Sequence, residues 1–159
     1  MKSAFPAFTL ALIAIPMFAQ NSSGILFSAH VPSGSHKIAE RLPIEIAIEN
    51  TGKEAIYIYG NLNYLISLFA STTNGKDLAP NAIIETMPPP PVKESFTKVE
   101  PGHSLHIVWK ENLKSLGIQV PGSYVLKFEY QSNFSPAFSF GLPVWNGSQS
   151  TTVTVLVSP

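Results

Sequence analysis

The side chains that could bind a metal ion are few in this chain and are spread along it. Cysteine is absent, so the nitrogen and sulfur donors are the imidazoles of His30, His36, His103 and His106 and three methionines. His103 and His106 form an HxxH pair, but residues three apart on a strand point to opposite faces and would not chelate as they would on a helix. The lack of cysteine and the scarcity of methionine argue against a copper carrier. We therefore interpret the histidines as surface or turn residues and expect neither a metal nor a cofactor.

The chain also lacks the motifs that place catalytic groups. No Gly-x-Ser-x-Gly elbow, His-Glu-x-x-His helix or phosphate-binding glycine loop is present, and no thiol nucleophile exists. Glu45, Glu49 and Glu129 alternate with apolar partners, which is typical of the solvated face of a sheet. We expect a protein that is not an enzyme, with a metal-binding or small hydrolytic protein as the weaker alternative.

One aromatic segment, residues 134–145 (FSPAFSFGLPVW), is the main candidate for binding a partner. It contains two prolines and a glycine and shows no sustained alternation. Large apolar side chains in an irregular loop are either buried or form a contact patch, and loops of this kind are common recognition sites in β-sandwiches. The candidate contact residues are Phe134, Phe138, Phe140, Leu142 and Trp145. The alternative, which we favour, is that Phe138, Phe140 and Trp145 fold back over the open end of the sandwich.

A second candidate surface lies among tyrosines and asparagines at positions 57–64. Tyr57, Tyr59 and Tyr64 cluster with Asn61 and Asn63, a composition found on adaptable contact surfaces. Tyrosine is also common in strands, so the structural interpretation of this cluster stays open.

The elements that must position these residues are strands. Residues 104–110 alternate, with Leu105, Ile107 and Trp109 on one face, and residues 124–131 alternate in the same way, with Tyr124, Leu126, Phe128 and Tyr130 on one face. Alternation of this kind predicts antiparallel strands with one buried face. Between the two strands, residues 111–116 predict about one turn of helix.

Further strands are predicted on both sides of this region. Residues 42–50 (LPIEIAIEN) and 55–59 (AIYIY) predict a hairpin closed by a turn at residues 50–53. The remaining predicted strands are residues 24–31, 64–71, 95–99 and 151–157. Residues 88–91 are four successive prolines, and we interpret them as a stiff polyproline connector between two sheets.

Together these elements predict an all-β fold, an immunoglobulin-like antiparallel β-sandwich of about seven to nine strands with one short helical turn. Tyr124 follows Pro121 and Gly122 and opens a strand, so we expect a tyrosine corner whose hydroxyl bonds the backbone near Leu116. Trp109 and Gly122 are assigned structural roles with Tyr124.

The first 19 residues predict a secretory signal peptide. Lys2 precedes an apolar run from Ala4 to Ala19 that is too short for a membrane span. We expect cleavage after Ala19, with residues 20–159 forming a single domain that is secreted or periplasmic and does not insert into a membrane. Ten basic and ten acidic residues are scattered and balance to a formal net charge of +0, which argues against nucleic-acid binding.

The turns between these strands resemble those of a known family. The turns are Asn50-Thr51-Gly52, then Pro101-Gly102-His103-Ser104 before a strand that ends in Trp109, then Pro121-Gly122-Ser123-Tyr124. This pattern resembles secreted bacterial immunoglobulin-like sandwich domains and is most similar to the domain of the BsuPI-type proteinase inhibitors. The resemblance implies the fold, whereas no stretch of this chain matches an inhibitory loop.

We therefore expect an exported, non-enzymatic module that binds a protein or peptide partner. No convergent polar pocket for a small molecule is visible in the sequence. Exposed sheet edges would allow strand addition, and the 134–145 segment would supply an apolar anchor. Proteinase inhibition of the BsuPI-like type is the alternative function.

Overall fold

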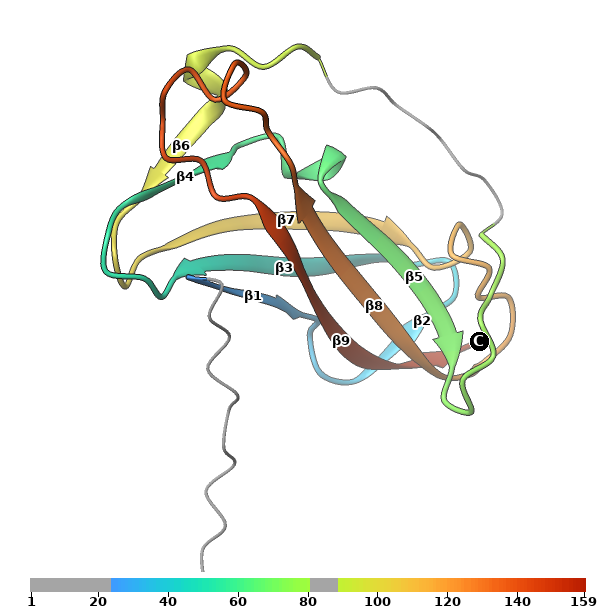
Figure 1. The fold of residues 1–159 in the computed structure, drawn as a ribbon. Helices are drawn as coiled ribbons and strands as arrows, with labels where there is room; N and C mark the ends of the chain where they lie inside the picture. The colour runs from blue at the N-terminus through green and yellow to red at the C-terminus, as the bar shows by residue number, and fades with distance from the viewer. Residues whose placement is uncertain (1–23, 81–88) are drawn as a thin grey trace, which may run out of the picture.

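The computed structural model describes residues 24–80 and 89–159, and these residues are arranged almost entirely as β-strands (Figure 1). The all-β prediction is confirmed. The proposed signal peptide and Pro88 of the proline run lie outside the described residues. The strands are β1 Ile25–His30, β2 Ser35–Lys37, β3 Arg41–Asn50, β4 Ile56–Tyr59, β5 Ile66–Thr72, β6 Phe96–Val99, β7 Ser104–Asn112, β8 Gly122–Ser132 and β9 Gly147–Ser158, with short 3-10 turns η1 Leu62–Tyr64 and η2 Lys93–Ser95.

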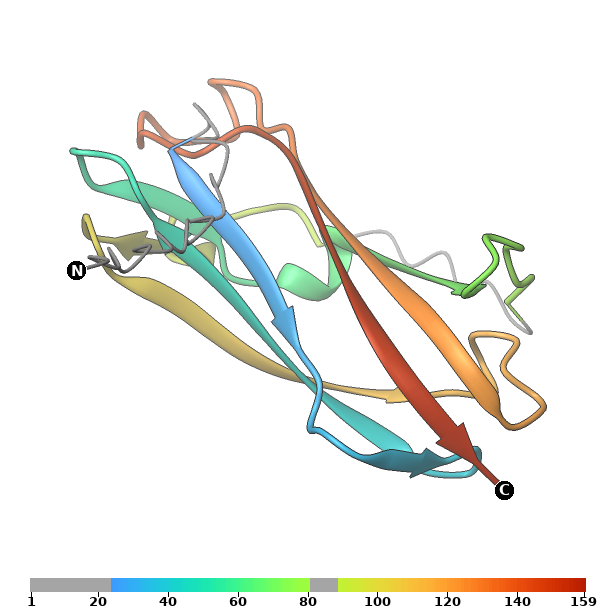
Figure 2. The same cartoon turned by 90° about the horizontal axis from the view of Figure 1, so that it is seen from below.

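The strands form two larger sheets and one small sheet. The first sheet has the order β1-β3-β7 and is antiparallel, and the second has the order β2-β9-β8-β5. Within the second sheet β2 runs parallel to β9, whereas the other neighbours are antiparallel. β4 and β6 pair as a separate ribbon. Figure 2 shows the two larger sheets as stacked layers.

The core lies between these two layers and is built by the alternating residues that the sequence indicates. Leu42, Ile44, Ile46 and Ile48 of β3 are fully buried, as are Leu126, Phe128 and Tyr130 of β8, and Tyr124 is nearly so. Leu105, Ile107 and Trp109 of the edge strand β7 are half-buried and pack against the same core. Val153, Val155 and Val157 complete it from β9.

The predicted hairpin between residues 42–50 and 55–59 is wrong. β3 pairs with β1 and β7, and β4 pairs with β6 instead. The physical reason is the fully buried side chain of Asn50, whose Nδ2 donates to the carbonyl oxygens of Glu54 at 2.8 Å and Val99 at 2.9 Å. Its Oδ1 accepts the Gly52 amide at 2.9 Å. These bonds hold the connection as a wide corner that delivers β4 to β6.

The predicted helical turn at residues 111–116 is also wrong. Glu111 and Asn112 are the last residues of β7, and the following residues form successive hydrogen-bonded turns. The Ile118 amide closes these turns by donating to the Leu113 carbonyl oxygen at 3.2 Å. Leu113 and Ile118 are both fully buried, so the turns are fixed by the core and not by helix propensity.

Tyr124 fastens the connection between the two larger sheets. Its hydroxyl donates to the carbonyl oxygen of Val120 at 2.8 Å, four residues upstream and not near Leu116 as expected. Val120 lies in the connection from β7 to β8, so this bond closes the corner where the chain changes sheets. A Cβ added at Gly122 would lie 3.6 Å from the Tyr124 ring, in ordinary contact with it.

Replacing Tyr124 by Phe removes this hydroxyl and leaves the ring in place. We expect the free energy of unfolding to fall by about 1 kcal/mol, because the carbonyl oxygen of Val120 loses a partly buried donor. Urea unfolding of the two proteins measures the difference. An unchanged midpoint would show that the hydrogen bond contributes nothing to the corner.

Tyr130 carries a phenol in the middle of the core. The residue is fully buried, and burial raises the pKa of Tyr130 to about 12, with the Ser132 hydroxyl opposing the rise. In the unfolded chain the phenol of Tyr130 should titrate near pH 10. Between these values the folded state holds a proton that the unfolded state has lost, so stability is complete below about pH 10 and decreases as the pH rises towards 12.

In the variant Tyr130→Phe the side chain at this position cannot ionise, so the variant should not show this decrease in stability at alkaline pH. We expect the wild-type protein to lose about 1 kcal/mol more than the variant between pH 9 and pH 11. Other groups titrate equally in both proteins, so the difference between their unfolding curves isolates Tyr130. Parallel losses in the two proteins would contradict the raised pKa.

Candidate functional site

The four histidines do not converge on a metal site. His30, His103 and His106 are exposed, whereas His36 is buried with its Nε2 2.9 Å from the Pro32 carbonyl oxygen and its Nδ1 3.5 Å from Glu40. Across residues 24–80 and 89–159, no three histidine, aspartate or glutamate side chains gather closely enough to hold a metal ion. Over the same residues, no helix has the length and apolar character to cross a membrane.

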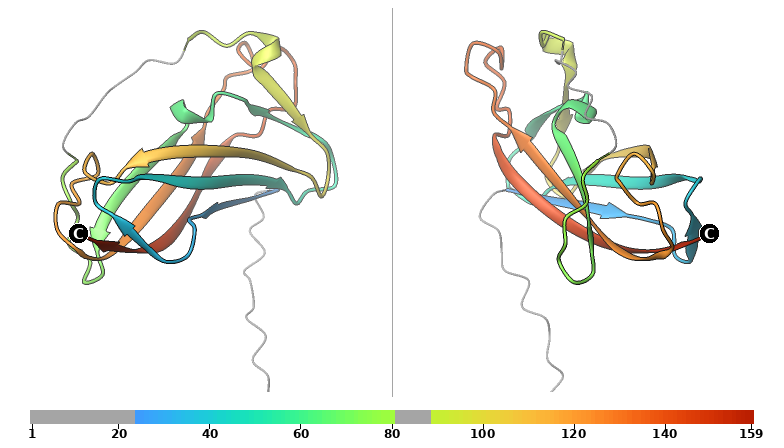
Figure 3. Two further views of the ribbon diagram at one scale, coloured as in Figure 1. Left: turned by 180° about the vertical axis from the view of Figure 1, so that it is seen from behind. Right: turned by 90° about the vertical axis from the view of Figure 1, so that its right-hand side faces the viewer.

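The two candidate binding segments meet at one end of the molecule. The 134–145 loop lies against the small β4–β6 ribbon there, as Figure 3 shows in two orientations. The Phe134 ring lies 5.1 Å from that of Tyr59 and 5.2 Å from that of Phe96 between ring centroids, and Tyr59 and Phe96 are 5.6 Å apart. We call Tyr59, Phe96 and Phe134 the aromatic base, because the exposed part of the loop stands on it.

Backbone hydrogen bonds fix the C-terminal part of the loop to β4. The Tyr57 amide donates to the Pro143 carbonyl oxygen at 3.1 Å, and the Trp145 amide donates to the Tyr57 carbonyl oxygen at 3.0 Å. At the start of the loop, the side chain of Asn146 holds the backbone of Phe134. The Asn146 Oδ1 accepts the Phe134 amide at 2.7 Å, and the Asn146 Nδ2 donates to the Phe134 carbonyl oxygen at 2.9 Å. The loop is therefore tied at both ends.

Trp145 belongs to the core and not to an exposed contact surface. Its ring stacks on that of Tyr130, with centroids 5.3 Å apart and planes inclined by 19°. The residue is 8% exposed. A Cβ at Gly147 would lie 2.8 Å from the Trp145 ring, so glycine there permits the close approach. Tyr59 is likewise buried, whereas Phe134, Leu142 and Tyr57 are half-buried.

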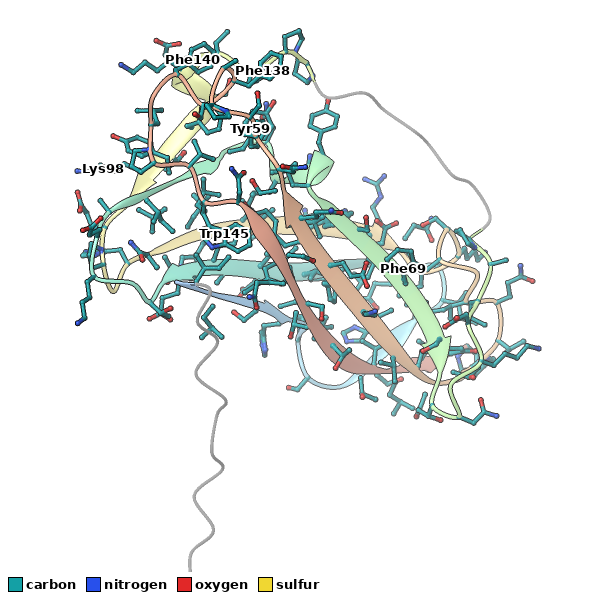
Figure 4. All side chains as sticks on the ribbon, viewed as in Figure 1. Tyr59, Phe69, Lys98, Phe138, Phe140 and Trp145 are labelled. Carbon is teal, nitrogen blue, oxygen red and sulfur yellow. The ribbon has the colours of Figure 1, made fainter. Side chains whose placement is uncertain are left out.

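Phe138 and Phe140 form the exposed tip of the loop, and we refer to them as the phenylalanine tip. Phe138 is 55% exposed and Phe140 is 44% exposed. Figure 4 shows both at the outer end of the loop, away from Trp145. They therefore do not plug the sandwich in the way that the favoured sequence interpretation proposed, although Phe140 touches the base through Phe96 at a centroid distance of 6.4 Å.

The tip is held by its own short hydrogen bonds. The Phe138 amide donates to the Ser135 carbonyl oxygen at 2.9 Å, and the buried Ser139 hydroxyl donates to the Pro136 carbonyl oxygen at 3.1 Å. Phe140 has a φ of 54° and is the single non-glycine residue with positive φ in the described part of the chain. A bulky residue in this left-handed conformation costs about 1–2 kcal/mol.

The tyrosine cluster is divided by the fold. Tyr59 points inward to the aromatic base, while Tyr64 lies on η1 and is exposed. Asn61 links to this group by donating to the Tyr59 hydroxyl at 3.4 Å. Tyr57 pairs with Lys98 across the β4–β6 ribbon. The cluster thus supports and borders the loop and does not form a separate surface.

An apolar groove of about 510 Å³, which the sequence does not predict, lies between the edge strands β5 and β7. Its walls include Ile66 and Leu68 of β5 and Trp109 of β7, and Leu78 and Leu116 lie beside them. The only signal in the sequence is that residues 64–71 carry apolar side chains on both faces, with Phe69 on the outer one. The spacing of β5 and β7 could not be derived from that signal.

Comparisons with known proteins leave the function open. No protein-family model matches the chain, and no curated protein matches it. Among solved structures, the chain is similar to a β-glucosidase from Erythrobacter marinus, with 14% sequence identity, a TM-score of 0.40 and 83% of this chain covered. The chain spans 15% of the length of that protein. A likeness of this size establishes neither a shared fold nor a shared activity.

Replacing Trp145 by Ser should unfold the region that supports the loop. We expect a loss of about 3–5 kcal/mol, because a large buried aromatic ring and its stack on Tyr130 are removed. Thermal and urea unfolding measure this loss. A variant with wild-type stability would show that Trp145 is not part of the core and would return it to the set of contact residues.

Proposed function

We propose that this chain is an exported, immunoglobulin-like β-sandwich module that binds a protein or peptide partner and catalyses no reaction. The observation that carries the proposal is the phenylalanine tip, two exposed aromatic side chains held on a loop that is tied at both ends. The strand order supports the immunoglobulin-like interpretation. The N-terminal region is shared between the sheets, with β1 antiparallel to β3 and β2 parallel to β9.

Folding alone gives no reason for Phe140 at its position. Its φ of 54° would be adopted more easily by glycine or asparagine, and its side chain gains only partial burial against Phe96. Exposed aromatic side chains near the centre of a contact patch commonly supply most of the binding free energy. The strain is therefore consistent with a residue kept for contact.

The tethers around the tip favour binding because they restrict it before a partner arrives. Ordering a flexible loop at an interface costs about 0.5–1.5 kcal/mol per side chain, and a loop already fixed avoids much of that cost. Polar groups border the same end of the molecule. Lys98 and Glu100 form an ion pair at 2.6 Å, and the hydrogen bond to Glu100 raises the pKa of Lys98. An apolar centre with a polar rim is the usual arrangement of a protein interface.

Proteinase inhibition is the second candidate, and the tethering of the loop is the observation that favours it. Protease inhibitors typically present a pre-organised loop whose backbone changes little on binding. A phenylalanine at the tip would suit a protease with a hydrophobic specificity pocket, as in chymotrypsin-like enzymes. The resemblance to the BsuPI-type domain points in the same direction, although the sequence offers no match to an inhibitory loop.

A capture experiment with matched variants tests the binding proposal. The purified protein and the double variant Phe138→Ser, Phe140→Asn are immobilised and exposed to native extracellular or periplasmic proteins. Asparagine tolerates the left-handed conformation, so the free energy of unfolding of the double variant should lie within about 0.5 kcal/mol of the wild-type value. Leu26→Ser, which removes an exposed side chain from β1, is the control.

The expected result is a partner retained by the wild type and by Leu26→Ser but weakened at least about tenfold in the double variant. A partner retained equally by a folded double variant would refute the role of the tip. Incubation with a chymotrypsin-like protease separates the second candidate. A stable complex with slow cleavage within residues 134–145 would indicate an inhibitor. Rapid cleavage or the absence of a complex would contradict inhibition and retain the first proposal, a binding module that does not inhibit proteases.

A further inference from the structure

The start of the 134–145 loop is held by the side-chain amide of Asn146. Its Oδ1 accepts the Phe134 amide at 2.7 Å and the buried Ser132 hydroxyl at 3.4 Å, and its Nδ2 donates to the Phe134 carbonyl oxygen at 2.9 Å. We call the two bonds between Asn146 and Phe134 the amide tie. Because the tie needs an acceptor and a donor side by side, it depends on the neutral amide form of the side chain.

The residue that follows Asn146 is a glycine for a separate structural reason. A Cβ added at Gly147 would lie 2.8 Å from the Trp145 ring, so any side chain there would displace the ring that stacks on Tyr130. The amide tie and the tryptophan therefore place asparagine directly before glycine. The sequence contains this pair twice, as Asn146-Gly147 and as Asn74-Gly75.

An asparagine followed by glycine can lose its amide group by reaction with its own backbone, because glycine has no side chain to hinder the approach. Hydroxide removes the proton of the Gly147 amide nitrogen, which then forms a bond to Cγ of Asn146. The bond from Cγ to Nδ2 breaks, and Nδ2 takes a proton from water and leaves as ammonia. Water opens either carbonyl group of the resulting succinimide ring and yields aspartate or isoaspartate. Both residues are exposed, so hydroxide and water reach them.

The amide tie opposes this reaction while it is closed. Attack makes Cγ tetrahedral and expels Nδ2, so the bonds that hold the planar amide of Asn146 against Phe134 must break as the reaction proceeds. Deamidation should therefore occur mainly in molecules whose loop has opened locally. Asn74 offers a comparison, because its Oδ1 accepts the Thr72 hydroxyl within an exposed turn and is not tied to a distant loop.

The product of the reaction cannot form the amide tie again. A carboxylate accepts hydrogen bonds and donates none. One carboxylate oxygen would still accept the Phe134 amide, but the other would face the Phe134 carbonyl oxygen, from which Nδ2 now lies 2.9 Å away. Two acceptors at that distance repel each other. Isoaspartate would also lengthen the backbone by a methylene group directly beside the Trp145 ring.

We propose that Asn146 is a deamidation site, and that its conversion to a carboxylate keeps the 134–145 loop open once the amide tie has been released. The reaction is covalent and loses ammonia to the solvent, so the ordered form of the loop has a limited lifetime. Figure 4 shows Phe138 and Phe140 at the outer end of this loop, so proteolysis beside them reports its release. Release in this way does not depend on what the phenylalanine tip binds.

The first measurement follows conversion at both Asn-Gly pairs of the same protein. The folded protein and the urea-unfolded chain are incubated in mildly alkaline buffer. Peptide mapping by mass spectrometry then separates asparagine, aspartate and isoaspartate at residues 74 and 146, with Asn74 as an internal clock. The variant Phe134→Leu is incubated in parallel, because it loses the ring contacts of the aromatic base and keeps the backbone groups of the amide tie.

We expect Asn146 to convert at least about tenfold more slowly in the folded wild type than in the unfolded chain, because the loop must open first. In Phe134→Leu the conversion of Asn146 should be at least about fivefold faster than in the folded wild type, because the loosened loop opens more often. Asn74 should convert at the same rate in both folded proteins, since its turn does not contact the loop.

The second measurement tests the consequence for the loop by limited proteolysis. Thermolysin cleaves beside large apolar residues and is not a chymotrypsin-like enzyme, so inhibition of such enzymes by the tip would not interfere. Cleavage within residues 134–145 should be at least about tenfold faster in Asn146→Asp than in the wild type. Asn74→Asp is the matched control and should be cleaved like the wild type. The deamidated wild type, separated by its extra negative charge, should be cleaved like Asn146→Asp.

Three results would overturn the inference. They are an Asn146 that converts only in the unfolded chain, equal conversion in the wild type and Phe134→Leu, and cleavage of the deamidated loop at the wild-type rate. If Phe134→Leu does not fold, urea below the unfolding transition loosens the wild-type loop in its place. If Asn146→Asp does not fold, the deamidated wild type, which folded before it reacted, decides the second measurement. Failure of the capture experiment with the phenylalanine tip would leave all of these outcomes unaffected.

Discussion

The position of the 134–145 loop depends on the buried ring of Tyr130. This ring lies 5.7 Å from that of Phe27, which comes from the opposite sheet, and stacks at 5.3 Å on that of Trp145. The same residue thus joins the two layers of the core and anchors the end of the loop. Because β8 holds Tyr130 in register between β5 and β9, the pairing of three strands determines where the loop leaves the core.

The other contacts of the loop follow from that anchor, one after another. Trp145 is fixed by the stack, its amide binds Tyr57 of β4, and β4 in turn carries Tyr59 into the aromatic base. Asn146 returns the start of the loop to the same place by clamping Phe134. With both ends held, only the middle of the loop is free to extend outward. That middle contains Phe138 and Phe140, which explains how two apolar residues stay exposed without disturbing the core.

Sequence reasoning succeeds where one strand and its own alternation decide the outcome. Leu126 and Phe128 are buried because their alternation is regular, and no other element is needed to predict it. It fails where a distant contact decides. The corner after β3 depends on the bond from Asn50 to Val99, 49 residues away, and local turn residues alone favoured a hairpin. The groove is a product of two edges that are far apart in sequence, and no local pattern contains it.

The candidate contact residues divide in the same way. The composition of residues 134–145 correctly singled out a loop that must place many aromatic rings, but composition cannot assign each ring to the core or to the surface. Trp145 is buried because Gly147 and Tyr130 provide space for a flat ring, and Phe138 is exposed because the turn from Ser135 carries it outward. Both decisions arise from tertiary geometry that the order of residues does not display.

The phenylalanine tip carries a cost that stability alone would remove. Phe140 adopts a left-handed conformation with a φ of 54°, and the residue is 44% exposed. The tip requires the aromatic base and the β4–β6 ribbon, whereas neither Phe138 nor Phe140 belongs to the core between the two larger sheets. Because the core is independent of the tip, the fold tolerates the strain at Phe140, and both phenylalanines can be altered by substitution while the core stays intact.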